Sequence, residues 1–308
     1  MIGAAVVLWT LTGLVLALAG WGLLIEPHLL EVTRLTVPLP RLPEELRGFT
    51  IGHLSDMHLR GNASARRVAE RACAELMALQ PELICLSGDV VDHASHLPEG
   101  IALLRRLAAP LGVFLVLGNH DCDATMEDYL AGNPESDQAQ EKWREALRAT
   151  EVALLDNEAR TLEVRGRRVV LVGIGDLCAG QDDLPAALRG APAGDLHLLL
   201  CHSPDTIDLP EADWADLVLA GHTHGGQMQI PGFGAVWAPV WRRRERASGL
   251  LRLGQTLLFV SRGLSSGLPA RINCRPQVAL LELVPGDPAG LPTTQRVPHV
   301  TSAEECHA

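Results

Sequence analysis

The chain has 308 residues, of which 47% are hydrophobic and 4% aromatic, so it can bury a sizeable core in one large domain or two small ones. Its 37 acidic residues outnumber its 26 basic ones, and the formal net charge of −11 argues against binding to nucleic acid, whose backbone needs a basic surface. The seven cysteines are odd in number and lack the C-x-x-C spacing of zinc sites, which favours buried free thiols in a reducing compartment.

The first element in chain order is an uncharged apolar run over residues 2–25. It is long enough to span a bilayer as a helix, and we expect residues 1–25 to form a single-pass transmembrane anchor. A cleaved signal peptide with Ala17-Leu18-Ala19 as its cleavage site is the alternative, although no Lys or Arg precedes the run. Arg34 and Arg41 follow the run and slightly favour a cytoplasmic position for the globular domain.

A connector punctuated by prolines is predicted over residues 26–47, with an edge strand at 31–37. The globular domain is predicted over residues 48–285, and its first half alternates strands with helices. The expected strands lie at 49–54, 83–86 and 113–117, and the expected helices at 63–79, 99–107 and 142–150. The second half is dominated by strands, expected at 196–201, 214–220 and 278–284. Two hairpins are also expected, one formed by 159–164 and 168–172 and joined near Gly166, the other over 249–260.

This order of elements predicts an α/β fold in which two sheets pack face to face with helices outside. After the last strand, residues 286–308 are rich in Pro, Thr and Glu, and we expect a disordered tail there.

Polar segments with metal-ligand side chains follow five of the apolar, strand-like runs. They are Asp56-Met57-His58, Gly88-Asp89-Val90-Val91-Asp92, Gly118-Asn119-His120-Asp121, His202, and Gly221-His222-Thr223-His224. In open α/β sheets, ligands bind outside the carboxyl ends of the strands, so these five segments are expected to converge. Residues at i and i+2 of an extended segment point to the same side, which lets both histidines of the last segment reach one metal centre.

The candidate ligands predict two divalent metal ions. Oxygen and imidazole ligands without thiolate suit manganese, iron or zinc, and we favour Mn²⁺ with Fe or Zn²⁺ as alternatives. Seven ligands are too many for one ion, so two ions would share one of them, and Asp89 sits centrally in chain order for that role. Two ions about 4 Å apart would clamp a phosphoryl group while a bridging hydroxide attacks in line.

Three residues beside these ligands have expected supporting roles. His120 is placed to donate a proton or hydrogen bond to the leaving oxygen, which makes it a catalytic candidate. Asp121 is expected to hold the His120 imidazole in its cationic form. Asp92 is expected to orient the loop or a ligand. His53, on the opposite side of its strand from Asp56, is interpreted as a packing histidine.

The motifs D-x-H, G-D-x-x-D, G-N-H-D, a single His and G-H-x-H, in this order, resemble the calcineurin-like metallophosphoesterase superfamily over about residues 48–284. The extended G-H-T-H-G-G-Q, residues 260–271 and the N-terminal anchor resemble its YkuE-like membrane-associated branch, which includes proteins similar to UDP-2,3-diacylglucosamine pyrophosphatases. The resemblance implies a four-layer α/β/β/α sandwich. One metal would take Asp56, His58, Asp89 and His224, and the other Asp89, Asn119, His202 and His222.

The same resemblance leaves several features open. Arg262 and Arg271 lie in the branch-typical stretch, where they would contact a substrate phosphate or form structural ion pairs. The cluster Trp241-Arg242-Arg243-Arg244 is read as a solvated basic loop, with bilayer headgroups or an anionic substrate as alternative partners. The polar stretch at residues 123–138 is longer than the family pattern and leaves the substrate-capping region undefined. The sequence does not indicate an oligomeric state.

The sequence as a whole predicts a membrane-anchored, dinuclear phosphoesterase that hydrolyses a phosphodiester or pyrophosphate bond. The anchor favours a lipid-linked substrate such as UDP-2,3-diacylglucosamine. A general phosphodiesterase without lipid preference and a metal-bound, non-catalytic scaffold are the alternatives, and retention of all seven ligands argues against the scaffold.

Overall fold

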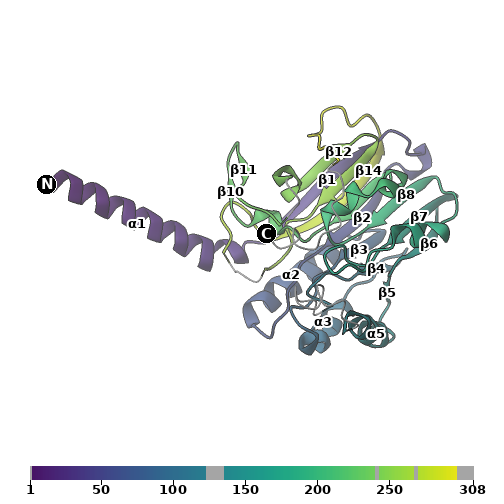
Figure 1. Ribbon diagram of the computed structural model, residues 1–308, viewed down its shortest axis with the longest axis horizontal. Coiled ribbons are helices and arrows are strands. Elements are labelled where there is room, and N and C mark those ends of the chain that lie inside the picture. Colours follow the sequence, from purple (N-terminus) through teal and green to yellow (C-terminus); the bar gives the residue numbers. More distant parts are fainter. Residues whose placement is uncertain (1, 123–134, 240–242, 267–269, 297–308) are drawn as a thin grey trace.

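Two six-stranded sheets form the body of the protein (Figure 1). The computed structural model describes residues 2–122, 135–239, 243–266 and 270–296. The first sheet has the order β1 (Glu31–Leu39), β14 (Gln277–Pro285), β2 (Phe49–Leu54), β3 (Leu83–Ser87), β4 (Val113–Val116) and β5 (Val152–Leu154). The second has the order β12 (Gly249–Leu253), β13 (Thr256–Val260), β9 (Leu217–Ala220), β8 (Leu196–Leu200), β7 (Arg167–Gly173) and β6 (Glu158–Val164).

Strand directions bring several carboxyl ends to one edge of each sheet. In the first sheet β2, β3, β4 and β5 run parallel to one another, and in the second β7, β8, β9 and β13 do so. Antiparallel pairs lie toward the margins of the sheets: β14 runs antiparallel to β2, β12 to β13, and β6 to β7. The hairpin expected near Gly166 is the β6–β7 pair.

Side-chain alternation along the strands builds three stacked apolar layers. On β8, Leu198 and Leu200 enter the core between the two sheets, whereas Leu199 faces the outer side of the second sheet. Helices α2 (Ala63–Ala78), α3 (Leu97–Leu104) and α5 (Glu135–Leu147) pack on the outer face of the first sheet. Helix α6 (Leu184–Arg189) and short 3₁₀ turns cover the second. The four-layer α/β/β/α sandwich is therefore confirmed.

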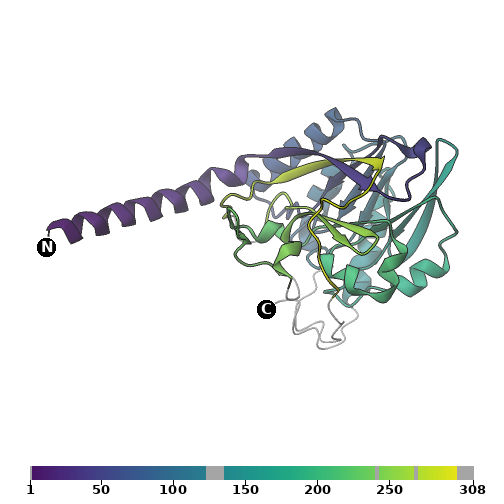
Figure 2. The ribbon, with the colours of Figure 1, turned by 90° about the horizontal axis from the view of Figure 1, so that it is seen from above.

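The N-terminal helix α1 (Ile2–Leu24) projects away from this body (Figures 1 and 2). It has the length and composition needed to cross a membrane, and almost none of its surface is buried by the rest of the chain. Its C-terminal end is fastened to residues 271–274. Arg271 N donates to Gly22 O at 2.8 Å, and Cys274 N donates to the Glu26 carboxylate at 2.6 Å. The Trp21 indole donates to the other Glu26 oxygen at 2.8 Å.

The structure corrects three boundaries drawn from the sequence. The predicted connector contains the full strand β1, which pairs in parallel with β14, so this part of it belongs to the domain. Residues 286–296 are not a disordered tail, because Arg246 binds Thr294 and the Gln295 carbonyl, while residues 297–308 lie outside the described part. Helix α5 begins at Glu135 rather than at residue 142, and most of the expected insertion, residues 123–134, also lies outside it.

Candidate metal centre

The five polar segments converge where the two sheets meet. Asp56 and His58 follow β2, Asp89 follows β3 and Asn119 follows β4, all from the first sheet. The second sheet contributes the other ligands, His202 after β8 and His222 and His224 after β9. The backbones interlock across the edge, since His222 N donates to both Asp56 carboxylate oxygens at 3.1 and 3.2 Å. One continuous site is thus built from both sheets.

Most of the expected ligands sit on strained backbone. Positive φ angles of 45–68° occur at Asp56, His58, Asp89, His222 and His224. A non-glycine residue held in this left-handed region costs about 1–3 kcal/mol and persists only where surrounding structure fixes it. Such strain is concentrated at functional sites, and here it turns each side chain inward immediately after its strand.

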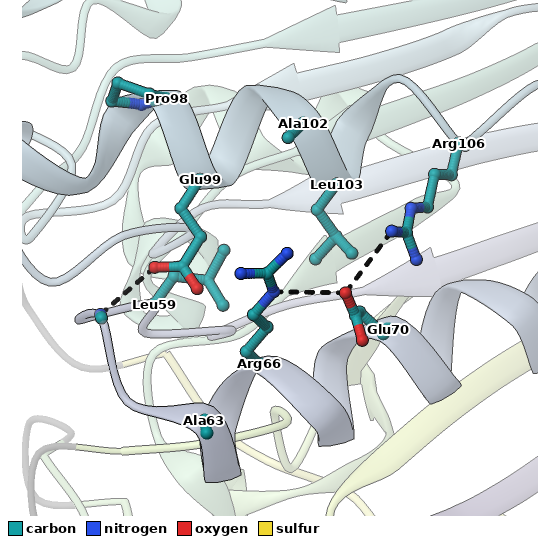
Figure 3. Close-up of a pocket in the computed structure, with 10 residues that line it drawn as sticks. Leu59, Ala63, Arg66, Glu70, Pro98, Glu99, Ala102, Leu103 and Arg106 are labelled. Carbon is teal, nitrogen blue, oxygen red and sulfur yellow. Dashed lines mark hydrogen bonds and ion pairs between the residues drawn. The ribbon is translucent and has the colours of Figure 1, made fainter.

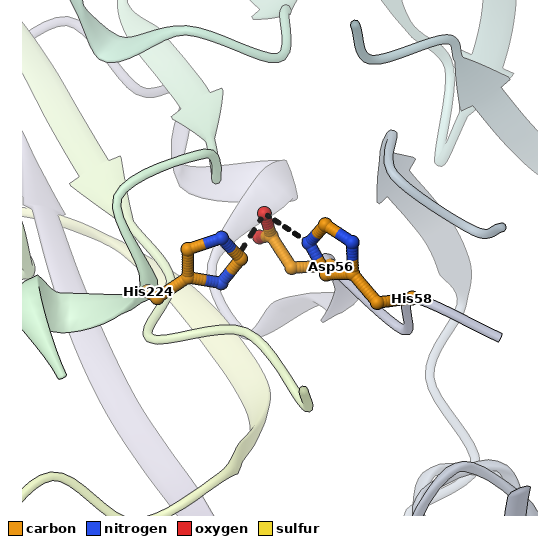
Figure 4. A group of neighbouring side chains, drawn as sticks. All are labelled: Asp56, His58 and His224. Carbon is orange, nitrogen blue, oxygen red and sulfur yellow. Dashed lines mark ion pairs between the residues drawn. The ribbon is translucent and has the colours of Figure 1, made fainter. Parts of the chain in front are cut away.

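One ligand group contains Asp56, His58 and His224 (Figure 4). Asp56 Oδ1 lies 4.0 Å from His58 Nε2 and 3.8 Å from His224 Nδ1. The two imidazoles flank the carboxylate from opposite sides, and Figure 4 shows both directed at the same oxygen. All three side chains are at least largely buried, with exposures of 1%, 0% and 16% for His58, Asp56 and His224. This geometry fits one cation.

Asp89 lies between this group and a second one. Its Oδ2 is 3.5 Å from His58 Nε2 and 3.2 Å from His202 Nε2. His222 adds to the second group, because its Nδ1 lies 3.1 Å from His202 Nε2. Asp89 therefore reaches both groups, and Asp56 also lies close enough to Asp89 and His202 to join a ligand group with them. A side chain at Gly118 would collide with the Asp89 carboxylate, so glycine is needed there.

Hydrogen bonds on the far side of two imidazoles fix which nitrogen faces the centre. His58 Nδ1 lies 2.6 Å from Asp92 Oδ1, and His202 Nδ1 lies 2.7 Å from Ser87 O. Nδ1–H therefore donates outward in both rings, so Nε2 is the nitrogen that faces the centre in each. Metal-ligating histidines are commonly held in this way, and here Asp92 orients the His58 imidazole.

Buried polar atoms at the centre lack partners that a cation would supply. Three candidate donor atoms, His58 Nε2, His224 Nδ1 and Asn119 Oδ1, are buried without a hydrogen bond among the described residues. Asp56 and Asp89 are at most 1% exposed, and neither has an ion pair with arginine or lysine in the described part of the chain. Burial raises the pKa of Asp56, with the Asp89 charge adding to it. Metal cations fit these oxygen and nitrogen atoms, because the buried carboxylates need positive charge beside them.

His120 is the most open of the imidazoles around the centre. Its side chain is 42% exposed, and its Nδ1 lies 3.5 Å from Asp92 Oδ1. The ring packs edge-on against His58 with centroids 4.7 Å apart, and its backbone N donates to Asp89 Oδ1 at 3.0 Å. His120 also lies close enough to His58 and Asp89 to join a ligand group with them. An exposed imidazole beside the centre can meet an incoming substrate.

Asp121 contacts backbone amides and not the His120 ring that the sequence analysis expected it to hold. Its two carboxylate oxygens accept hydrogen bonds from Val91 N at 3.0 Å and Gly118 N at 3.1 Å. It therefore ties the second ligand loop to the third instead of holding His120, and Asp92 is the carboxylate beside that ring. Burial and the nearby Asp89 charge raise the pKa of Asp121 to about 7.

One buried carboxylate at the centre was missed from the sequence. Asp176 follows β7, the neighbour of β8, and is 0% exposed. One of its oxygens accepts from Ala179 N at 2.7 Å, and the other is buried without a partner among the described residues. Burial raises the pKa of Asp176 to about 6, although the charge of His202 acts to lower it. The signal was available, since Gly173-Ile174-Gly175-Asp176 closes an apolar run as the other segments do.

The two arginines considered for substrate binding have structural partners instead. Arg262 forms an ion pair with Glu31 on β1 at 2.7 Å. Arg271 is 1% exposed, and its guanidinium donates to the backbone carbonyls of Arg262, Ser265 and Cys274. Both side chains thus hold the segment after β13 in place. His53 is fully buried against Phe259, with ring centroids 5.5 Å apart, which confirms its packing role.

Two cavities lie beside the site. One of about 500 Å³ separates α2 from α3, and Figure 3 shows Arg66 and Arg106 paired with Glu70 there, while Glu99 accepts a hydrogen bond from Gly61 N. The other, of about 270 Å³, lies between the end of α1 and the ligand loops. Its lining includes Leu23, Arg60, Asn62, Leu264 and Ser265. Arg60 is two residues from His58, and the backbone N–H groups of Leu264 and Ser265 donate to Asp56 O.

The fold and this constellation define a metal-dependent phosphoesterase. The family model for calcineurin-like phosphoesterase matches residues 49–226, and the chain belongs to this family. It is therefore a hydrolase of phosphoester bonds. In the first relative, phosphodiesterase YaeI of Escherichia coli, 35% of 243 aligned residues are identical, covering 77% of this chain and 82% of that one.

Two further relatives extend over more of the chain. The uncharacterized metallophosphoesterase YkuE of Bacillus subtilis is 28% identical over 86% of this chain and 89% of its own. UDP-2,3-diacylglucosamine pyrophosphatase LpxG of Chlamydia trachomatis is 28% identical over 85% of this chain and 91% of its own. The expected resemblance to the YkuE-like branch is confirmed.

Proposed function

We propose that the protein is a membrane-anchored phosphoesterase with two divalent metal ions that hydrolyses a phosphodiester or pyrophosphate bond. The observation that carries the proposal is the position of Asp89, whose Oδ2 lies 3.5 Å from His58 Nε2 and 3.2 Å from His202 Nε2. One carboxylate within reach of two separate imidazole groups is the arrangement that a pair of metal ions requires.

The proposed ligand sets follow these two groups. One ion is held by Asp56, His58, Asp89 and His224, and the other by Asp89, Asn119, His202 and His222. When bound, such ions, Mn²⁺ by preference and Fe or Zn²⁺ as alternatives, polarise the phosphoryl oxygens and activate water as the nucleophile.

The protein's own groups complete the proposed chemistry. His120 donates a proton to the leaving oxygen, since its ring is exposed beside the centre and can reach substrate. Asp92 Oδ1 lies 3.5 Å from His120 Nδ1 and orients that ring beside the centre. Asp121 positions the backbone of two ligand loops and does not contact the ring.

A lipid-linked substrate fits the site better than a freely diffusing one. The cavity of about 270 Å³ between α1 and the ligand loops combines apolar Leu23 and Leu264 with polar Arg60 and Asn62. A diphosphate headgroup entering there would come directly from the membrane that α1 spans. The similarity to LpxG supports a UDP-2,3-diacylglucosamine-type substrate, whereas the similarity to YaeI supports a general phosphodiesterase.

The substrate proposal is tested with full-length protein in detergent, supplied with Mn²⁺ or with chelator. Bis-p-nitrophenyl phosphate and UDP-2,3-diacylglucosamine are assayed side by side. Manganese-dependent cleavage of the lipid well above that of the model diester is the expected result. Cleavage of the diester alone would support the general phosphodiesterase, and two bound ions without hydrolysis of either would support the scaffold.

The role of His120 is tested by His120→Asn, with His197→Asn as the matched control because His197 pairs with Asp216 near the start of β8, away from the centre. His120→Asn should lower turnover by about 10²–10⁴ while bound metal is unchanged. Loss of metal together with turnover would make His120 a ligand, and full activity would end its proposed role.

For the location, we infer an uncleaved anchor with the domain on the cytoplasmic side. Cysteines without disulfides support a reducing compartment, and the six in the described part are all buried thiols that form no disulfide. N-terminal sequencing of the membrane-extracted protein tests the anchor, because a mature start at Gly20 would mean a cleaved signal. Protease protection of the domain in sealed, right-side-out vesicles tests its side.

A further inference from the structure

Exposed apolar side chains outside α1 are concentrated in one short hairpin. Strands β10 (Gln229–Ile230) and β11 (Gly234–Ala235) pair antiparallel directly after the ligand loop that carries His222 and His224. We call residues 228–237 the apolar hairpin. Its large exposed side chains are Met228 (40%), Ile230 (51%), Phe233 (60%), Val236 (46%) and Trp237 (53%). Among described residues beyond Ile25, the other large apolar side chain exposed to this degree is Val32, at 37%.

The apolar hairpin lies beside the end of the proposed anchor. Gln229 N donates to Ile272 O at 3.0 Å, and Ile272 N donates to Gln227 O at 2.9 Å. The preceding residue, Arg271, donates its backbone N to Gly22 O on α1. Figure 1 accordingly places β10 and β11 on the side of the body from which α1 leaves. The exposed apolar surface is therefore continuous with the region where a spanning α1 would enter the bilayer.

The side chains around the apolar hairpin match the chemistry of a membrane interface. Arg244 stacks over the Phe233 ring, with its guanidinium carbon 4.8 Å from the ring centroid. Aromatic residues and arginine are characteristic of the interface, where rings enter the acyl boundary and guanidinium groups remain among the phosphates. Arg243 pairs with Glu245 at 3.7 Å, so Arg244 is the residue here that offers local positive charge to anionic lipid in a chain whose net charge is −11.

We propose that the apolar hairpin inserts into the lipid interface next to α1 and forms a second membrane contact. This inference rests on the proposed membrane anchoring of the protein. A single span leaves the body free to tilt, whereas two adjacent contacts fix its orientation. Strands of two residues offer too little edge for a partner chain to extend the sheet, which favours lipid over protein as the occupant.

The second contact would also fix the metal centre relative to the membrane. Gly226 follows His224 by two residues, has a φ of 69° and lies so close to β11 that an added Cβ would be 2.6 Å from Ala235 Cβ. The apolar hairpin thus packs directly on the ligand loop. Its insertion would hold the centre at a set height above the phosphates, where a lipid headgroup is presented.

The test uses full-length protein in liposomes and a fluorescent probe on Phe233→Cys. Cys306, which lies outside the described residues, is replaced with serine, and the six described cysteines are buried. An NBD label at position 233 is compared with one at Thr161→Cys, an exposed position on β6 at the margin of the second sheet. Phospholipids carrying a doxyl group at acyl carbon 5 serve as quenchers.

We expect doxyl lipids to quench the label at position 233 by roughly two-fold or more, because interfacial segments bury about 5–10 Å into the acyl boundary. The label at position 161 should be unaffected. Equal quenching at both positions, or none at either, would overturn the proposal. A blue-shifted but unquenched label at position 233 would also overturn it, since it would indicate contact with a second copy of the chain.

A second variant links the contact to turnover. Ile230→Ser, Phe233→Ser and Trp237→Ser combined should leave cleavage of soluble bis-p-nitrophenyl phosphate at the wild-type rate. Cleavage of a lipid-linked pyrophosphate in liposomes should fall by roughly ten-fold, since a tilted body loses the orientation of its site. Unchanged lipid cleavage would overturn the orienting role. Quenching at position 233 without lipid cleavage by the wild type would refute the proposed substrate and leave the membrane contact established.

Discussion

Replacing Asp92 with asparagine should weaken the binding of one metal ion and leave the other unchanged. Asp92 Oδ1 lies 2.6 Å from Nδ1 of His58, whose side chain is only 1% exposed. Burial acts to raise the pKa of Asp92, but the hydrogen bond and charge of His58 outweigh burial and hold this pKa below its usual value. The Asp92 carboxylate is therefore ionised at neutral pH. Asparagine keeps the shape and an acceptor oxygen but removes the charge that makes His58 a stronger ligand.

The magnitude follows from the type of interaction. A buried hydrogen bond to a charged group contributes about 1.5–3 kcal/mol, and loss of such a partner behind a metal-ligating histidine lowers metal affinity by about 10–100-fold. Titration calorimetry of metal-free, full-length protein with Mn²⁺ should therefore show one weakened and one unchanged binding step. The weakened step belongs to the ion held by Asp56, His58 and His224.

Asp216→Asn is the matched control, because Asp216 is also paired with a histidine, His197, at 3.2 Å but lies near the start of β8. It should leave both Mn²⁺ binding steps unchanged. Equal weakening of both steps by Asp92→Asn, or no weakening at all, would refute the assignment of Asp92 as the group that orients His58.

Three further predictions concern single positions. Burial lowers the pKa of His53 to about 3, so the wild-type fold loses stability as the pH falls from 6.5 toward 3, because the buried imidazole resists protonation. At pH 5 this loss is about 2 kcal/mol, and His53→Leu should not show it. Thermal unfolding of both proteins at pH 7 and pH 5 measures the difference. Arg246→Met should cost about 3–5 kcal/mol in denaturant unfolding, because it removes the buried guanidinium that pairs with Asp205 and Asp208, and a change under 1 kcal/mol would contradict this. Gly118→Ala should abolish normal Mn²⁺ binding by displacing the Asp89 carboxylate, whereas Gly190→Ala, where a Cβ meets nothing closer than 3.7 Å, should bind Mn²⁺ like the wild type.

The convergence of the candidate ligands could be predicted because their positions follow local rules. An apolar run ending in Asp, Asn or His marks a buried strand whose carboxyl end meets others at one edge, and Asp56, Asp89 and His202 obey this pattern. The same rule would have found Asp176 after β7. The two-sheet core was also visible, since side chains of a run such as residues 196–200 alternate between two apolar layers.

What the sequence did not predict depends on contacts between distant segments. Adjacency in the chain suggested that Asp121 serves His120, but its carboxylate turns inward to the amides of Val91 and Gly118. The partner of Arg262 is Glu31, which lies 231 residues away on β1. The order of residues 286–296 likewise depends on Arg246, whose buried guanidinium binds the Gln295 carbonyl. Composition carries no information about such long-range pairs.

The measurement that tests the central claim most directly is the metal content of purified full-length protein, determined together with hydrolysis of bis-p-nitrophenyl phosphate. We predict two ions per chain, loss of hydrolysis on chelation, recovery with Mn²⁺, and loss of both ions and hydrolysis in Asp89→Ala. One ion per chain with full activity, or hydrolysis that survives complete removal of metal, would contradict the dinuclear site.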